Sequence, residues 1–214
     1  MENSNQTSLR EFLSSCFEVD IEHLKLSLDS NDPWNNHWDD DVFFIDKWEK
    51  FYKQYPKKMH TISRYPKYVE DRSKFHQLNV FYNNEMEDSK QIEYFLEEQK
   101  FINVIKKLWV YSRCYVESNI CFQENYPENT DSKVIEQLKG IMSSGIVEID
   151  EWEPLESLLK LNLRDYIGTC LYFTELKLII WPGDFNCPIY IGNESNIELL
   201  EKICTVEGVY LTYE

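Results

Sequence analysis

The chain has 214 residues, of which 43% are hydrophobic and 15% aromatic, and its net charge is −16. A chain of this length and composition can bury a sizeable core without a metal or a disulfide, which excludes an intrinsically disordered protein. The excess of carboxylates disfavours binding to nucleic acids and anionic membranes, because phosphate groups would be repelled. We therefore expect a highly soluble protein or one that binds a basic protein partner.

The sequence shows no targeting or membrane-spanning segment. No apolar run approaches the ~20 residues that cross a bilayer, and residues 1–10 lack the basic-then-apolar pattern of a signal peptide. The six cysteines are dispersed and form no Cys-x-x-Cys pair, as expected of free thiols in a reducing compartment. We expect a cytoplasmic protein without a bound metal or cofactor.

Helical spacing dominates the first two-thirds of the chain. A loose tail, 1–7, comes first. The apolar pattern of 17–28 fits two short strands, one bulged strand or a helix, and 31–41 is a loop rich in Asn and Asp. The basic segment 56–74 is irregular, and 78–82 is a weak strand candidate. Capping signals and apolar repeats predict four helices: three at about 8–17, 42–55 and 89–120, and a fourth that is capped by Asp131 or Ser132 and stopped by Gly145.

Strand signals appear in the last third. A Pro-Gly-Asp turn at 182–184 separates two apolar runs and predicts a β-hairpin. The predicted strands are 169–173, 176–181, 187–191 and 209–213, and short helices are predicted at 154–161 and 195–204. The fold class is therefore α+β, with a helix-rich N-terminal two-thirds and a C-terminal β-hairpin–helix–strand module. We expect a single domain over 1–214, with a possible subdivision near 126–131.

The sequence contains no recognisable catalytic motif. Its six glycines form neither a Gly-x-x-x-x-Gly-Lys nor a Gly-x-Gly-x-x-Gly phosphate cradle, and no zinc-ligand spacing occurs. His37 beside Asp39–Asp41 is the one candidate metal cluster, but it lacks the alternating ligands of a calcium loop and is better explained as a solvated acidic loop. We predict no catalytic residue, although a Cys and a His distant in sequence could still meet in the fold.

Two short segments combine carboxylates with a tryptophan, which is a pattern that suits recognition of a basic partner. A tryptophan supplies buried area at an interface, while carboxylates speed the encounter and fix its register. The alternative is an ordinary acidic surface whose tryptophan is turned into the core. The candidate partner-binding residues are Trp38, Asp39, Asp40 and Asp41 in the first segment, and Asp150, Glu151, Trp152 and Glu153 in the second.

An acidic, motif-poor α+β chain of this size resembles the bacterial immunity proteins of polymorphic-toxin and contact-dependent-inhibition systems. The resemblance rests on the acidic balance and on the terminal module, Leu171–Ile191 followed by Ser195–Tyr213. It implies a stoichiometric inhibitor of a basic toxin domain, and it assigns no functional residue.

Three other classes of function remain open: a non-catalytic adaptor, a nucleic-acid-mimicking defence or counter-defence protein, and an unrecognised enzyme. A mimic of nucleic acid would need regular rows of carboxylates. The segment 47–74, with nine basic and three acidic residues, interrupts such rows.

Overall fold

Seven strands form one antiparallel sheet in the computed structural model, which describes residues 9–17, 19, 48–67, 81–82, 87–127, 130–143 and 145–213. The strands are β1 (Met59–Ser63), β2 (Cys114–Ser118), β3 (Val147–Glu148), β4 (Thr169–Phe173), β5 (Leu178–Ile180), β6 (Asn186–Ile191) and β7 (Tyr210–Thr212). Their spatial order is β3-β2-β4-β5-β6-β1-β7, so that β3 and β7 form the two edges. The predicted mixture of helix and sheet is confirmed.

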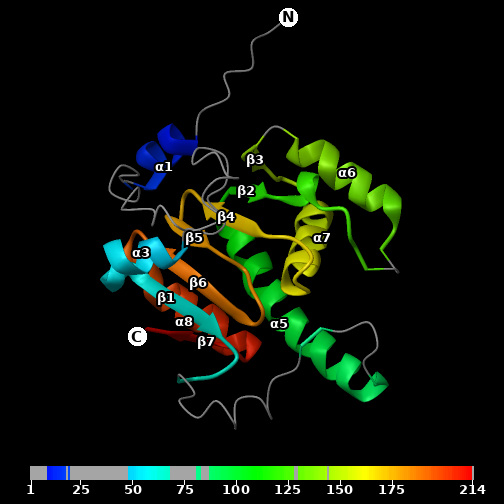
Figure 1. Ribbon diagram of the computed structural model, residues 1–214. Coiled ribbons are helices and arrows are strands. Elements are labelled where there is room, and N and C mark those ends of the chain that lie inside the picture. Colours follow the sequence, from blue (N-terminus) through cyan, green and yellow to red (C-terminus); the bar gives the residue numbers. More distant parts are fainter. Residues whose placement is uncertain are drawn as a thin grey trace, which may run out of the picture.

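Helices cover both faces of the sheet (Figure 1). The α-helices are α1 (Leu9–Phe17), α3 (Trp48–Gln54), α5 (Asp88–Tyr111), α6 (Ser132–Met142), α7 (Trp152–Leu163) and α8 (Ile197–Glu207). Three 3-10 turns accompany them in the described ranges: η2 (Pro56–Lys58), η3 (Ile120–Phe122) and η4 (Glu194–Asn196). Side chains of α5, α7 and α8 pack on one face, and those of α1 and α3 pack on the other.

The two faces bury different kinds of side chain because neighbouring strand residues point in opposite directions. Leu171 and Phe173 of the central strand β4 join a mainly aliphatic core under α5 and α7. Cys170 and Tyr172 point the other way, into an aromatic cluster in which Phe12 lies 5.5 Å from the Tyr172 ring, between ring centroids. All five residues of β4 are buried, as expected of a strand covered on both faces.

The long helix ends earlier than the sequence predicts, because α5 stops at Tyr111 and β2 begins at Cys114. The apolar repeat continues past this point without a Gly or Pro, so sequence reasoning extended the helix to Ile120. Glu175, in the turn between β4 and β5, accepts hydrogen bonds from the Ser112 hydroxyl at 2.8 Å and the Arg113 amide at 2.7 Å. Pairing of β2 with β4 therefore overrides the local preference for helix.

The basic segment 56–74 was predicted to be irregular, but it contains β1, which pairs with both β6 and β7. The strands β1 and β2 show that the first two-thirds of the chain contributes to the sheet as well as to the helices. The tail 1–7, the loop 31–41, most of 17–28 and residues 78–80 lie outside the described residues. None of the helices in the described ranges is long and apolar enough to cross a membrane.

Candidate functional site

The second predicted acidic segment lies at an edge of the sheet and runs into the start of α7. We call Glu148, Asp150, Glu151 and Glu153 the acidic edge; all four side chains are exposed. Glu148 accepts a hydrogen bond of 2.8 Å from the Tyr115 hydroxyl on the neighbouring strand. Neither Asp150, Glu151 nor Glu153 forms an ion pair with any described residue. Three carboxylates of the acidic edge are thus unpaired within the part of the chain that the structure describes.

The formation of α7 accounts for some of the carboxylates in the acidic edge. Glu151 occupies the N-cap position in an extended conformation, with φ −107°, and Glu153 follows in the first turn. A negative charge there interacts favourably with the helix dipole. Pro154 is tolerated because backbone amides of the first turn have no partner within the helix. The interaction with the helix dipole explains a carboxylate at Glu153, but it does not explain the one at Asp150, which precedes the helix.

Trp152 is half-buried and held by internal contacts. Its indole nitrogen donates to Glu156 Oε2 at 2.6 Å, and its ring lies 5.8 Å from that of Trp109, between centroids. The Lys106 ammonium lies 4.9 Å from the Trp152 ring. A hydrogen bond from Lys160 lowers the pKa of Glu156 against the opposing effect of burial. The acidic edge therefore presents carboxylates to solvent, while the tryptophan anchors the start of α7.

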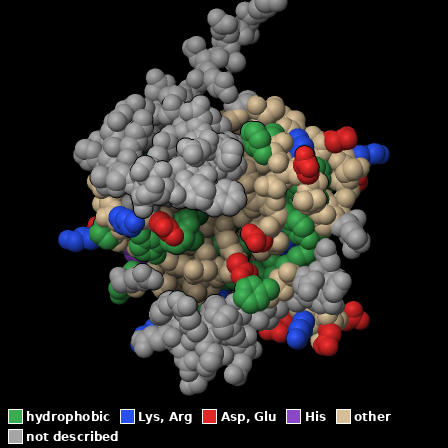
Figure 2. Space-filling model, in the orientation of Figure 1, with side chains coloured by type: hydrophobic (Ala, Val, Ile, Leu, Met, Phe, Trp, Pro, Cys, Tyr) green, Lys and Arg blue, Asp and Glu red, His purple; other side chains and the backbone are tan. Residues whose placement is uncertain are grey.

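The structure brings together Asp150, Glu151, Trp152 and Glu153, as their adjacency in sequence requires. The first predicted segment, Trp38, Asp39, Asp40 and Asp41, lies outside the described residues. Figure 2 shows acidic and basic side chains interspersed over the face that it presents, without long rows of one sign.

A polar cleft lies at the opposite end of α7, and sequence reasoning missed it. Its volume is about 450 Å³. Four segments far apart in sequence contribute to it, so no contiguous motif could have revealed it. The described lining residues are Trp48, Asn119, Gln123, Asn162, Asp165, Tyr166, Ile167, Gly168, Thr169, Trp181, Pro182, Gly183, Asn186 and Pro188.

The end of α7 determines the shape of this cleft. Asp165 has a left-handed backbone, with φ 62°, directly after the last helical turn. The Tyr166 amide donates to the Leu161 carbonyl at 3.0 Å, and the Asp165 amide donates to the Asn162 carbonyl at 2.9 Å. These two bonds form a Schellman motif, which usually has a glycine at the left-handed position. The chain therefore turns sharply from α7 into the cleft wall.

Buried amides and hydroxyls hold that wall in place. Asn162 is 7% exposed, and its Oδ1 accepts a hydrogen bond from the Thr169 hydroxyl. Asn119 Oδ1 accepts from the Gly168 amide at 2.9 Å, and the Ser118 hydroxyl donates to the Gly168 carbonyl at 3.1 Å. The backbone on both sides of Gly168 is therefore fixed to the end of β2.

A buried ion pair joins the C-cap residue of α7 to α5. Arg164 donates two hydrogen bonds of 2.7 Å to the carboxylate of Glu98 on α5, and the Glu98 side chain is only 4% exposed. The Arg164 guanidinium lies 5.2 Å from the Tyr82 ring and 5.1 Å from the Phe95 ring. This bidentate pair fixes the end of α7 to α5.

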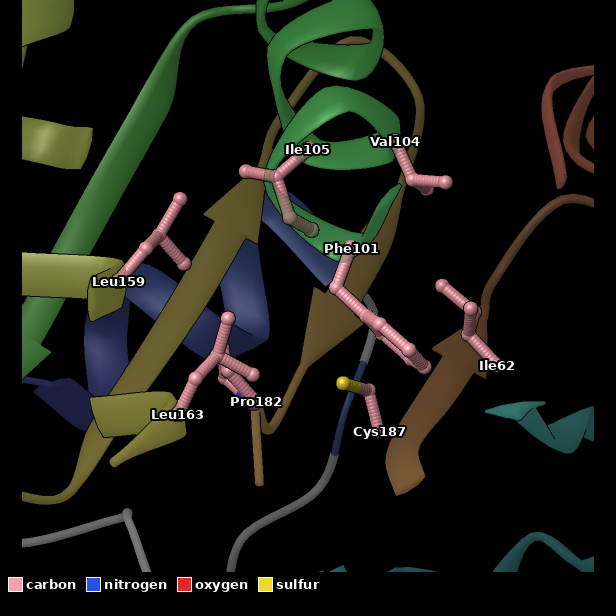
Figure 3. A pocket seen from close by; sticks show the side chains of 8 residues that line it. All are labelled: Ile62, Phe101, Val104, Ile105, Leu159, Leu163, Pro182 and Cys187. Atoms are coloured by element: carbon pink, nitrogen blue, oxygen red, sulfur yellow. The ribbon is translucent and has the colours of Figure 1, made fainter. Parts of the chain in front are cut away.

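An apolar cavity on the α5 side of the sheet is too small to be a ligand site (Figure 3). Its volume is about 10 Å³, and eight apolar residues or cysteines line it, among them Phe101, Leu163 and Cys187. A space of this size and polarity is expected to stay dry. Burial raises the pKa of the Cys187 thiol to about 12, so it stays protonated and unreactive at neutral pH.

Among the described residues, no group of three or more His, Cys, Asp or Glu side chains is placed to hold a metal ion. No protein-family model, curated protein or solved structure matches the chain. Its function therefore has to be argued from the geometry of the acidic edge and the polar cleft.

Proposed function

We propose that the protein binds and silences a basic protein, in the manner of a bacterial immunity protein that neutralises a toxin domain by forming a stoichiometric complex. The observation that carries this proposal is the acidic edge, with Asp150, Glu151 and Glu153 exposed and unpaired with any described residue.

Unpaired carboxylates are suited to this role, because a basic partner need not break an internal ion pair to reach them. Opposite charge raises the association rate and orients the encounter. The net charge of −16 extends the same attraction over the whole chain. Among the described strands, β3 has a neighbour on one side only, and an edge strand of this kind can pair with a partner chain.

The setting that we propose is the cytoplasm of a bacterium. The six free cysteines, four of them buried, suit a reducing compartment. In this proposal the C-terminal hairpin, helix and strand act as the scaffold, and recognition takes place at the acidic edge.

The test is to titrate the purified chain into each basic toxin domain encoded next to its gene, measuring heat by calorimetry and residual toxin activity in parallel. We expect one-to-one binding and full inhibition at equivalence, because the inhibitor occupies the toxin and is not turned over. Loss of toxin activity at far less than one equivalent would indicate a catalytic mechanism and contradict the proposal. If the protein binds none of the toxin domains encoded next to its gene, the proposed function is wrong.

A further inference from the structure

The polar cleft has a chemistry that the acidic edge lacks, because it is concave and rich in hydrogen-bond acceptors. We infer that the polar cleft accepts an arginine side chain from the basic partner, with Asp165 as its counter-charge and amide oxygens as its hydrogen-bond acceptors. The identity of the donor as a basic protein rests on the proposed function, whereas the chemistry of the cleft stands on its own.

The first argument is charge. Asp165 is exposed to the cleft and forms no ion pair with a described residue, and no Lys or Arg is found among the described residues that line it. A second carboxylate, Asp184, lies nearby in the turn between β5 and β6. Burial raises the pKa of Asp184, as does the negative charge of Asp165, while Arg64 acts in the opposite direction. A bound cation would relieve the repulsion between these carboxylates.

The second argument is hydrogen-bonding capacity. Each amide oxygen has two lone pairs, and the Oδ1 atoms of Asn119 and Asn162 each accept one described hydrogen bond. One lone pair on each oxygen is therefore left for a ligand. Gln123 and Asn186 add two further amides to the lining. A guanidinium group carries five N–H donors and no acceptor, so it matches a wall of acceptors.

The third argument is the aromatic wall. Trp48 on α3 lines the cleft and is 37% exposed, so part of its indole is accessible to a ligand. Arginine stacks on aromatic rings more readily than lysine, because its guanidinium is planar and less strongly hydrated. Acceptors, a carboxylate and an accessible indole together favour arginine over lysine. An anionic ligand would meet the unpaired carboxylate of Asp165, which would repel it.

The test uses the full-length chain and small probes, so it does not depend on finding the partner. Backbone amide and indole NMR signals are followed while the amides of N-acetyl-arginine, N-acetyl-lysine and N-acetyl-citrulline are added in turn. Citrulline has the shape of arginine without its charge. Methyl glucoside is added as a neutral, hydroxyl-rich probe.

We expect arginine amide to shift the signals of Gly168, Thr169, Gly183 and the Trp48 indole, with a dissociation constant on the order of 1–10 mM for a single side chain. Citrulline amide should bind at least about fivefold more weakly, because it lacks the charge that Asp165 attracts. Equal binding of citrulline, tighter binding of methyl glucoside at the same amides, or arginine shifts located elsewhere would each overturn the inference.

A variant separates the role of the carboxylate from that of the cleft shape. Asp165→Asn removes the charge, and asparagine adopts the left-handed backbone readily, so the turn should be retained. We expect it to weaken arginine amide binding at least about fivefold. The matched control is Glu136→Gln on α6, an exposed carboxylate that does not line the cleft, and it should leave the affinity unchanged. An Asp165→Asn protein that binds arginine amide as tightly as the wild type would overturn the inference.

The outcome of these experiments can be distinguished from the outcome of the toxin-binding test. A cleft that binds arginine amide in a protein that binds no encoded toxin would support this inference and remove the proposed function. A chain that neutralises a toxin but shows no arginine-specific shifts in the cleft would keep the proposed function and overturn this inference.

Discussion

The two ends of α7 present two kinds of surface. At its start, Asp150, Glu151 and Glu153 are consecutive or nearly consecutive in sequence, exposed, and unpaired with any described residue. At its end, the polar cleft is assembled from four separate segments and held by buried groups such as Asn162 and the Glu98–Arg164 pair. The comparison shows that an exposed charged surface adds few constraints to a fold, whereas a concave polar site requires the backbone around it to be fixed.

This difference predicts opposite responses to mutation. Substitutions of Asp150, Glu151 and Glu153 should alter association with a partner and leave the free energy of unfolding nearly unchanged, because these side chains form no ion pair with a described residue. Substitutions of the buried polar groups at the end of α7 should change stability first, since they leave their buried partners unsatisfied.

The largest effect is expected for Arg164→Ala. It leaves the Glu98 carboxylate buried without its bidentate partner, so we expect the free energy of unfolding to fall by about 3–5 kcal/mol. Urea denaturation measures the loss. The matched control is Arg113→Ala, whose ion pair with Glu175 is largely exposed and should contribute far less. Similar losses in the two variants would show that the cleft end is no more constrained than the surface.

The elements that sequence analysis located well are those with local signals. The helix α6 (Ser132–Met142) lies within its predicted bounds, which left Asp131 or Ser132 as the cap and Gly145 as the stop. The N-cap is Asp131, which accepts a 2.9 Å hydrogen bond from the Lys133 amide. The strand β4 (Thr169–Phe173) also lies where its apolar run predicts it. In both, the residues that determine the conformation are close neighbours in the chain.

The features that sequence analysis missed depend on distant partners. The strand β1 forms by pairing with β6 and β7, more than a hundred residues away, and its own sequence alternates poorly. The polar cleft joins Asn119, Asn162 and Gly183, which share no motif or regular spacing. The acidic edge could be located from sequence because its charges are contiguous. The internal contacts of Trp152 could not be foreseen, since Trp109 and Lys106 belong to another helix.

A smaller effect is expected at Glu175, a paired carboxylate near the acidic edge. Burial would raise its pKa, but hydrogen bonds from Arg113, Ser112 and Thr174 outweigh this and lower the pKa of Glu175 to about 2. Its contribution to stability is therefore complete above about pH 4.5, the ordinary value, and is lost as the pH falls toward 2. The side chain is 42% exposed, so we expect Glu175→Gln to destabilise the protein by about 0.5–1 kcal/mol at neutral pH.

Urea denaturation of the wild type and of Glu175→Gln across pH 2–6 measures this contribution, and the two curves should converge toward pH 2. A constant difference over the whole range would mean that the paired carboxylate stabilises by a mechanism other than its charge.

The smallest effect is expected for Asp184→Asn beside the polar cleft. Burial and the charge of Asp165 raise the pKa of Asp184, so its ionised form costs stability above that pKa. Replacing it with asparagine should stabilise the protein at neutral pH by no more than about 0.5 kcal/mol, since the carboxyl group is only partly removed from solvent. The gain should vanish as the pH falls through the raised pKa toward 3.8. A thermal melt in which Asp184→Asn lowers stability at neutral pH would show that the two carboxylates do not repel each other.

The most direct test of the proposal measures how fast the protein associates, as a function of salt, with a basic toxin domain encoded next to its gene. The test variant is Asp150→Asn/Glu151→Gln/Glu153→Gln. The control, Glu194→Gln/Glu198→Gln/Glu201→Gln, makes the same change in net charge at exposed residues of η4 and α8. We predict that association slows as salt increases, and that at about 50 mM salt the test variant associates roughly tenfold more slowly than the wild type while the control stays within about twofold. An association rate that ignores salt, or that falls equally in both variants, would contradict recognition through the acidic edge.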